Sequence, residues 1–297
     1  MMPRLSIVVP VYNDFAALQK CLDALQSQLA VHGPEVECLV VDNGSEASLD
    51  EIAERFPEVT FLEELTPGSY AARNAGVRQA TGEFIAFTDS DCIPEEDWVE
   101  AILEVTSSFP SIDLHVGDIV LFADSDGGKT VDRRVIAYEL ATAFRQEYYA
   151  NYVHFGPTAN LIVRRVTFEK LQGFDQSLKS GADKKFGQNA WQAGFKIRFS
   201  PECVVRHPTR STLIQLENKI RRIVGGDYLK AVNKPQKIMA NLTRYILLRP
   251  GNSLRLIWTR AGMSVHDRMA ASEVVFRAIG WQVSEHQRLR SGGQAQR

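Results

Sequence analysis

The sequence has 297 residues, of which 44% are hydrophobic and 24% are charged, and these values are ordinary for a globular protein. This length is ample for a buried core and allows one large α/β domain with an appendage, or two domains. Four widely spaced cysteines without a Cys-x-x-Cys pair indicate reduced thiols in a cytosolic protein, with neither a disulfide framework nor a zinc site. The N-terminus leads directly into a predicted strand, so we expect no signal peptide. No run approaches roughly 18 apolar residues, so we also expect no membrane-spanning helix.

The formal net charge is only −2, but the charge is unevenly distributed along the chain. Residues 1–202 contain 17 Lys/Arg and 31 Asp/Glu, whereas residues 203–297 contain 17 Lys/Arg and 5 Asp/Glu. The two parts therefore carry −14 and +12. A basic last third predicts an anionic partner, such as a membrane surface or a nucleic acid, or a tail that packs on its own acidic domain.

The first part of the chain alternates short apolar runs with helical patterns. Leu5–Pro10 is predicted to be a strand that ends at Pro10, because proline cannot donate to a central ladder. Asn13 or Asp14 can cap the following helix, whose apolar residues recur at spacings of three and four. Further elements are expected at Val36–Val41 (strand), Ser48–Phe56 (helix) and Thr60–Leu62 (strand). This order predicts a parallel sheet with right-handed crossovers.

Acidic residues follow two of the predicted strands. Asp42 comes directly after Val36–Val41, and Asp89 and Asp91 follow Phe84–Phe87, an apolar run typical of a strand buried on both faces. Ligands bind at the carboxyl ends of strands in open α/β sheets, where an acid after the second strand can hydrogen-bond a nucleotide base or ribose. Two carboxylates one residue apart suit a divalent cation. Ordinary turns are the alternative, since Asp is common there.

A glycine-containing segment precedes this second acidic site. Ser69 is expected to cap a helix that continues to Ala80. Gly76 within that helix costs about 1 kcal/mol relative to alanine, and close packing against the sheet would explain the cost. Arg73 lies one turn before Gly76, where its guanidinium can pair with a diphosphate. A surface arginine is the alternative.

The chain from residue 94 to residue 210 is expected to continue the alternation. The predicted helices are Glu95–Phe109 with Pro94 at its start, 131–149, a short helix ending at Gly173, and Lys184–Ala193. The predicted strands are Leu114–Phe122, Ala159–Val163, Lys196–Phe199 and Cys203–Val205, and Asp124–Gly128 is expected to be a loop.

Two polar residues stand out at the ends of these later elements. Asp183 lies at the start of the last helix, where a carboxylate is also an ordinary cap. His207 follows the last strand and is either a metal ligand or an ordinary polar residue.

The motifs, in this order, resemble family 2 glycosyltransferases of the GT-A fold over roughly residues 4–210. The resemblance rests on Val-Val-Pro-Val-Tyr-Asn13, Val-Val-Asp42-Asn-Gly-Ser, Ala-Ala-Arg73-Asn-Ala-Gly, Thr-Asp89-Ser-Asp91, Gln172-Gly-Phe-Asp175, Gly-Ala-Asp183 and His207. It implies an α/β fold with a Rossmann-like, mostly parallel sheet flanked by helices, followed by a helical extension. It also implies a catalytic domain at 1–210, with a nucleotide-sugar half at about 1–94 and an acceptor half at about 95–210.

On the donor side, the resemblance implies a role for each motif residue. Pro10, Tyr12 and Asp42 would line the nucleoside pocket. Arg73 and Asp89 would contact the nucleotide. The donor would be a nucleotide-sugar, foremost a UDP-sugar.

At the reacting centre, the resemblance implies that Asp91 binds Mg²⁺ or Mn²⁺ at the diphosphate, with His207 as a further ligand. The cation would neutralise the charge that develops on the leaving group. Asp183 would be the general base that takes the proton of the acceptor hydroxyl. One base without an enzyme nucleophile implies a single displacement that inverts the anomeric centre. Ala182 stands where many relatives carry Glu, which weakens the assignment of the acceptor side.

These features predict a metal-dependent transferase that glycosylates a hydroxyl of a glycan or a lipid-linked acceptor in polysaccharide synthesis. No Gln-x-x-Arg-Trp motif follows, which favours non-processive transfer. A sugar-nucleotidyltransferase is one alternative, but it should show a glycine-rich basic loop at Val11–Asp14. A non-catalytic, membrane-associated scaffold is another, supported only by Ala182. No Gly-x-Gly-x-x-Gly motif follows the first strand, which argues against a dehydrogenase.

Residues 211–297 lie outside the resemblance and form a basic region with helical patterns. An apolar stripe runs along residues 213–223 beside Lys219, Arg221 and Arg222, and Gly225-Gly226 is expected to end that helix. Basic amphipathic helices suit an anionic membrane interface, which predicts peripheral binding at the cytoplasmic face. A helical cap on the catalytic domain or a dimer surface is the alternative. No nucleic-acid-binding motif is recognised.

Overall fold

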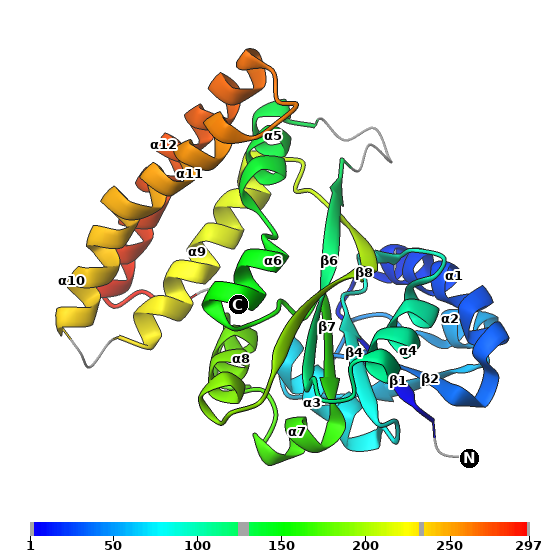
Figure 1. Cartoon of the computed structure of the whole chain (residues 1–297). Helices are drawn as coiled ribbons and strands as arrows, with labels where there is room; N and C mark the ends of the chain where they lie inside the picture. The colour runs from blue at the N-terminus through cyan, green and yellow to red at the C-terminus, as the bar shows by residue number, and fades with distance from the viewer. Residues whose placement is uncertain (1–2, 124–130, 232–234, 296–297) are drawn as a thin grey trace. The chain divides into compact units, whose positions relative to one another are not determined.

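The structure is a computed structural model that describes residues 3–123, 131–231 and 235–295. The chain divides into two compact units (Figure 1). The first unit comprises Met1–Val120, Arg145–Ser177 and Ala182–His207, and the second comprises Leu121–Phe144, Leu178–Gly181 and Pro208–Arg297. The predicted loop Asp124–Gly128 lies outside the described residues.

A sheet of eight strands, in the order β3-β2-β1-β4-β7-β6-β8-β5, is the centre of the first unit. The strands are β1 (Leu5–Val11), β2 (Val36–Asp42), β3 (Val59–Glu63), β4 (Phe84–Thr88), β5 (Ile93–Pro94), β6 (Leu114–Phe122), β7 (Asn160–Arg164) and β8 (Ile197–Pro208). The predicted parallel arrangement is confirmed for β1 to β4. The later strands make the sheet mixed, because β7 is antiparallel to β4 and β6, and β5 is antiparallel to β8.

Helices flank this sheet, which confirms the predicted α/β class. They are α1 (Phe15–His32), α2 (Asp50–Arg55), α3 (Ser69–Gln79), α4 (Trp98–Ser108), α6 (Gln146–Tyr148), α7 (Arg165–Lys170) and α8 (Ala182–Gln192), with the short 3₁₀ helix η1 (Gly33–Glu35) and the π-helix η2 (Tyr149–Val153). In Figure 1, α1 and α2 lie on one side of the sheet and α3 on the other. Right-handed crossovers require this, because the chain moves outward from β1 to β3 and then returns past β1 to β4. The carboxyl ends of β1 and β4 therefore form the switch point where ligands bind in such sheets.

β1 continues one residue beyond Pro10, which corrects the prediction that this proline ends the strand. The Val11 carbonyl accepts a hydrogen bond of 2.9 Å from the Asn43 N–H, on the β2 side. The backbone N–H and C=O groups of successive residues point toward opposite neighbouring strands, so the backbone groups of Pro10 point toward β4. There the pairing ends at Val8 with Phe87, so the missing N–H of Pro10 removes no bond of the ladder.

Helix α3 packs closely on the sheet, as the glycine in its sequence predicted. A Cβ on Gly76 would lie 2.5 Å from Val8 Cγ1 and 3.1 Å from Val41 Cγ2. The predicted cap is wrong by one residue, since Ser69 is the first helical residue and Gly68 is the N-cap. Gly68 has a φ of 130°, which residues with a side chain rarely adopt. Two glycines thus set the start and the depth of α3.

The short strand β5 corrects the prediction that Pro94 starts a helix. Ile93 pairs with Arg206 and Pro94 with Val205, and α4 begins only at Trp98. The partner β8 is one long strand where two were predicted. Because the two strands are antiparallel, the residue before Ile93 faces the residue after Arg206. This register sets Cys92 opposite His207.

A buried amide ties β8 to the middle of the sheet. Asn160 in β7 is fully buried and donates to the carbonyl oxygens of Asp118 (2.8 Å) and Cys203 (2.9 Å). Its own carbonyl oxygen accepts from the Trp98 indole N–H at 3.1 Å. Buried amides that satisfy their hydrogen bonds in this way specify one arrangement of the elements they join. Asn160 thereby fixes three strands and α4 around the end of β4.

The second unit is helical, as predicted for residues 211–297. Its helices are α5 (Arg133–Thr142), α9 (Leu213–Leu229), α10 (Pro235–Thr243), η3 (Arg244–Leu248), α11 (Arg249–Thr259) and α12 (Val265–Arg290). The apolar stripe of α9 faces the interior, where Leu216 and Ile220 pack with Val135 of α5 and Val274 of α12. No helix among the described residues is both long enough and apolar enough to cross a bilayer.

Two helix boundaries differ from the prediction. Gly225-Gly226 lies buried inside α9 instead of ending it. The helix expected at 131–149 is broken after Thr142, where Phe144 adopts a left-handed φ of 48°, and the chain continues into α6 and η2. Tertiary packing overrides local propensity at both places.

Candidate active site

Four side chains gather at the carboxyl end of β4 and form what we call the cation cluster: Asp89, Asp91, Cys92 and His207. One ligand atom from each lies within 4.8 Å of the others. His207 Nε2 lies 3.9 Å from Asp91 Oδ1. The end of β4 supplies the two acids, and the pairing of β5 with β8 brings Cys92 and His207 to them. The two residues predicted to hold a metal ion, Asp91 and His207, are therefore neighbours.

The donor atoms of the cation cluster fit a divalent cation. Carboxylate oxygens suit Mg²⁺ and Mn²⁺, imidazole suits transition metals, and a thiol favours softer ions. Burial raises the pKa of the Cys92 thiol, and the carboxylates of Asp89 and Asp91 raise it further. In the absence of a cation, the sulfur is therefore a neutral thiol.

Arg73 and Asp89, the two residues predicted to contact the nucleotide, form an ion pair with each other. The Arg73 side chain is only 4% exposed, and its Nη1 donates to the Ser69 carbonyl at 3.2 Å. Its Nε has no hydrogen-bond partner among the described residues. A buried donor of this kind is costly unless it is satisfied, and an oxygen of a bound ligand would satisfy it.

Asp183 lies in the first turn of α8, where its Oδ1 accepts two hydrogen bonds. One comes from the Lys184 backbone N–H (2.8 Å) and the other from the Tyr70 hydroxyl (3.1 Å). Burial raises the pKa of Asp183, and the charge of Asp89 acts in the same direction, although the two hydrogen bonds and Arg73 oppose them. A carboxylate with a raised pKa is a stronger base for a proton transfer.

Pro10, Tyr12 and Asp42 form a second group at the same edge of the sheet, since β1 lies between β2 and β4. The Tyr12 side chain is half exposed. Asp42 accepts from the Ser45 N–H (3.1 Å) and hydroxyl (2.5 Å), and the Ser45 hydroxyl accepts from the Asn13 N–H (2.9 Å). These bonds link the loops that follow β1 and β2.

Tyr70, Asn43 and Cys92 belong to this edge but were not predicted. Asn43 accepts from the Gly68 N–H at 2.6 Å and donates to the carbonyl oxygens of Glu64 and Thr66, each at 2.8 Å, so it holds the loop that leads into α3. Each of the three residues follows or lies near a motif residue in the sequence. That adjacency is the signal that could have indicated them.

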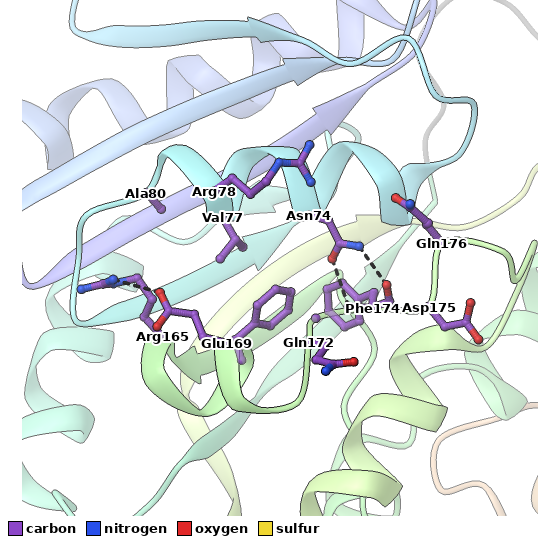
Figure 2. Close-up of a pocket in the computed structure, with 12 residues that line it drawn as sticks. Asn74, Val77, Arg78, Ala80, Arg165, Glu169, Gln172, Phe174, Asp175 and Gln176 are labelled. Atoms are coloured by element: carbon purple, nitrogen blue, oxygen red, sulfur yellow. Dashed lines mark hydrogen bonds and ion pairs between the residues drawn. The ribbon is translucent and has the colours of Figure 1, made fainter.

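A separate pocket of about 570 Å³ opens beside α3 and α7 (Figure 2). Asn74 exchanges two hydrogen bonds with the Phe174 backbone there, and Arg165 pairs with Glu169 at 3.0 Å. None of the predicted site residues lines this pocket, whose lining is Asn74, Val77, Arg78, Ala80, Arg165, Phe168, Glu169, Gln172, Gly173, Phe174, Asp175 and Gln176. The pocket is therefore distinct from the edge that holds the cation cluster.

Comparison of the sequence with known proteins gives matches to glycosyltransferases. The family model "Glycosyl transferase family 2" matches residues 6–171. Glycosyltransferase AglE of Haloferax volcanii is 35% identical over 214 residues, which cover 70% of this chain and 68% of that protein. Pre-mycofactocin glycosyltransferase of Mycobacterium tuberculosis is 26% identical over 70% of this chain and 43% of that protein.

Solved structures share the fold. Mannosyltransferase PcManGT from Pyrobaculum calidifontis, in complex with GDP-Man and Mn²⁺, aligns with a TM-score of 0.61 and 17% identity over 97% of this chain and 87% of that chain. S. aureus TarS 1–349 in complex with UDP-GlcNAc aligns with a TM-score of 0.56 and 16% identity, over 98% and 92%. At these identities the likeness shows the GT-A type of fold.

Proposed function

The chain belongs to glycosyltransferase family 2, and from this premise we propose that it is an inverting, metal-dependent, non-processive enzyme. It would move a sugar from a UDP-sugar to a hydroxyl of a glycan or lipid-linked acceptor. The observation that carries the proposal is the cation cluster at the switch point of the sheet, joined to Asp183 through Arg73 and Tyr70. The GDP-Man, Mn²⁺ and UDP-GlcNAc in the two solved structures support a nucleotide-sugar and a cation for this fold.

On the donor side, we assign binding of the nucleoside to Pro10, Tyr12 and Asp42. The half-exposed Tyr12 ring offers an aromatic face, and Asp42 offers carboxylate oxygens that accept hydrogen bonds. Arg73 fixes Asp89 and keeps its Nε–H for an oxygen of the diphosphate.

Asp91 and His207 would hold Mg²⁺ or Mn²⁺, with the Cys92 sulfur beside them. When bound, the cation would stabilise the negative charge that develops on the departing nucleoside diphosphate.

On the acceptor side, Asp183 takes the proton of the acceptor hydroxyl. The hydroxyl oxygen forms a bond to the anomeric carbon while the bond from that carbon to the diphosphate oxygen breaks. Because one displacement occurs without an enzyme nucleophile, the anomeric configuration inverts. Ala182 is fully buried and offers no second carboxylate, so Asp183 would act as the base alone.

The substitution Asp183→Asn tests this proposal. We expect transfer to fall by about 10²- to 10⁴-fold, the usual range for loss of a general base, while Mn²⁺-dependent thermal stabilisation by the nucleotide-sugar persists. Asp50→Asn is a matched control, because Asp50 is an exposed acid in the first turn of α2. Unchanged transfer by Asp183→Asn would show that Asp183 only shapes the helix start.

The released product separates this function from a sugar-nucleotidyltransferase. A glycosyltransferase releases a nucleoside diphosphate, whereas a nucleotidyltransferase forms a nucleotide-sugar and releases pyrophosphate. UDP-, GDP- and dTDP-sugars should be screened with Mn²⁺, first for thermal stabilisation and then for turnover. No stabilisation by any of them would count heavily against the proposal.

We also propose that the second unit binds an anionic membrane surface at the cytoplasmic face, where a lipid-linked acceptor would be found. Leu247 and Leu248 in η3 are 65% and 62% exposed, and the adjoining helices α10 and α11 carry the exposed cations Lys237 and Arg255. Exposed apolar side chains next to cations suit a membrane interface.

A further inference from the structure

Tyr70 connects the proposed base to the donor side of the site. It lies in the first turn of α3, and its hydroxyl is 3.1 Å from Asp183 Oδ1. The guanidinium carbon of Arg73 lies 5.8 Å from the centre of the Tyr70 ring. The ring is also 5.6 Å from the ring of Phe174, centre to centre. Four side chains, Asp89, Arg73, Tyr70 and Asp183, thus form one connected series.

Resting on the proposed function, we propose that Tyr70 is a positioning residue whose hydroxyl orients the Asp183 carboxylate toward the acceptor. Both hydrogen bonds to Asp183, from Tyr70 and from the Lys184 N–H, go to Oδ1. The second oxygen, Oδ2, is thereby left to receive the acceptor proton. A carboxylate held at one oxygen by two donors has a fixed plane, which is the geometry that proton transfer requires.

Tyr70 can act only as a donor in this arrangement. Burial raises the pKa of its hydroxyl, and the negative charge of Asp183 raises it further, so the proton stays on the Tyr70 oxygen. The Asp183 carboxylate, in turn, can only accept while it is ionised. The hydrogen bond therefore has one direction, and it favours the charged, basic form of Asp183.

The other groups around Asp183 determine how strongly the Tyr70 hydrogen bond affects its ionisation. From α3, Tyr70 and Arg73 favour the ionised carboxylate, as does the Lys184 N–H at the start of α8. Burial and the charge of Asp89, after β4, oppose it. Removing the hydroxyl takes away one of three stabilising partners, so the carboxylate should become harder to ionise.

The series also ties the position of the base to α3, the helix that carries the donor-side arginine. The depth of α3 is set by Gly76 against Val8, and its start is set by Gly68. A shift of this helix would move Arg73 and Tyr70 together. Such a shift would therefore disturb the donor-side arginine and the hydrogen bond to the base at the same time.

The substitution Tyr70→Phe removes the hydroxyl and keeps the ring that packs on Phe174. We expect kcat to fall about tenfold to a hundredfold, as for loss of a hydrogen bond to a charged group, with an unchanged KM for the nucleotide-sugar. The acid limb of the kcat profile should move to higher pH, because Asp183 loses a partner of its charged form. Tyr152→Phe is the matched control, since Tyr152 is 74% exposed in η2.

A fluorinated tyrosine at position 70 gives the opposite test. Its hydroxyl is more acidic and donates more strongly, so the acid limb should move to lower pH. Carboxyl carbon NMR of the full chain reports the Asp183 titration without turnover. There the Asp183 pKa should be higher in Tyr70→Phe than in the unchanged protein.

The outcomes separate the two proposals. If Asp183→Asn abolishes transfer but Tyr70→Phe leaves kcat, the acid limb and the Asp183 titration unchanged, the role of Tyr70 is overturned and the function stands. If Asp183→Asn leaves transfer unchanged, the proposed base itself is wrong. A fall in kcat for Tyr70→Phe without a shift in the acid limb or in the Asp183 titration would also overturn the positioning role of Tyr70, because a merely structural role predicts that result.

Discussion

Cys92 places a sulfur atom among the oxygen and nitrogen atoms of the cation cluster. Co²⁺ bound by a thiolate shows an intense sulfur-to-metal charge-transfer absorption in the near ultraviolet, whereas oxygen and nitrogen ligands alone do not. A cation that coordinates sulfur also displaces the thiol proton, which burial and two carboxylates otherwise retain. We expect Co²⁺ titration of the protein to produce this band.

Cys92→Ser should abolish the band while Co²⁺ still binds through Asp91 and His207. Cys38→Ser is the control, because Cys38 is equally buried but lies in β2, outside the cluster. A band that persists in Cys92→Ser, or its absence from the unchanged protein, would mean that the sulfur does not coordinate the cation.

At the scale of single residues, the sequence predicted site residues that belong to recognised motifs. It missed residues whose role depends on contact with another side chain. Asp91 and His207 were predicted together, and the structure places them 3.9 Å apart between atoms. Arg73 and Asp89 were both expected to contact the nucleotide, and the structure adds that they pair with each other. Tyr70 was missed because its partner, Asp183, is far away in the chain. Its position near Arg73 could have indicated that Tyr70 lies at the site, but the contact with Asp183 depends on tertiary structure.

At the scale of elements, α3 depends on the missing side chain of Gly76. Gly76→Ala would gain about 1 kcal/mol of helix propensity, but its Cβ would meet Val8 Cγ1 at 2.5 Å. Overpacking typically costs about 1–3 kcal/mol, so we expect a net loss of stability. Transfer should fall as well, because Tyr70 and Arg73 move with the helix. Thermal melts and a transfer assay measure the two effects.

Gly280→Ala is the matched control for this substitution. Gly280 lies exposed in α12, and a Cβ there meets nothing within 4 Å. The melting temperature of the Gly280→Ala protein should rise slightly, since only the helix propensity changes. If Gly76→Ala behaves like Gly280→Ala, the close contact with Val8 does not limit the packing of α3.

Strong periodicity made most of the elements predictable, and its absence explains the failures. Helix α1 begins at Phe15 with Asp14 as its cap, as its apolar stripe and cap predicted. β5 has only two residues, too few to show any hydrophobic periodicity, and proline is common at the first position of a helix, which is where Pro94 was predicted. Its pairing with β8 is a property of the tertiary fold. The antiparallel direction of β7 was likewise not contained in its five residues.

At the scale of the whole molecule, the excess of basic residues in the second unit serves shared ion pairs. Glu139 contacts both Lys219 (2.8 Å) and Arg210 (3.0 Å). Glu285 contacts Arg221 (3.0 Å) and Arg288 (2.6 Å) in the same way. Several cations that appeared free in the sequence are thus held by few acids, and part of the basic bias is structural.

Glu139 gives a stability prediction with a defined pH range. Burial opposes its ionisation, but Lys219 and Arg210 prevail and lower its pKa from 4.5 to about 2. A carboxyl whose pKa is lower in the folded state stabilises the fold above its unfolded pKa. This contribution should be lost as pH falls from 4.5 toward 2.

Glu139→Gln should cost about 3–5 kcal/mol at neutral pH, because Lys219 and Arg210, each only 25% exposed, would lose the buried carboxylate that they share. Urea unfolding of the full chain at several pH values measures this. The difference between the variant and the unchanged protein should shrink through the same acid range. Glu147→Gln, at an exposed glutamate, is the control. A difference that does not depend on pH would exclude Glu139 as the titrating group.

Binding to an anionic membrane can be tested on the whole molecule. Sedimentation with vesicles that contain anionic phosphatidylglycerol should capture the protein, and capture should weaken with salt and with neutral lipid. Leu247→Glu should reduce capture, because it replaces an exposed apolar contact with a negative charge. Val31→Glu, at a 79% exposed residue of α1, should not. Equal capture by both variants would mean that η3 does not face the lipid.

The pairing of β5 with β8 has a consequence for the order in which the enzyme is made. A chain still being synthesised displays Asp89 and Asp91 long before His207 has emerged, so the cation cluster cannot be complete until β8 has been added. Contacts of such long sequence separation form slowly. A cation that binds only the finished cluster then stabilises the last strand in place. Newly made chains would therefore gain the capacity to use a donor only after β8 has joined the sheet.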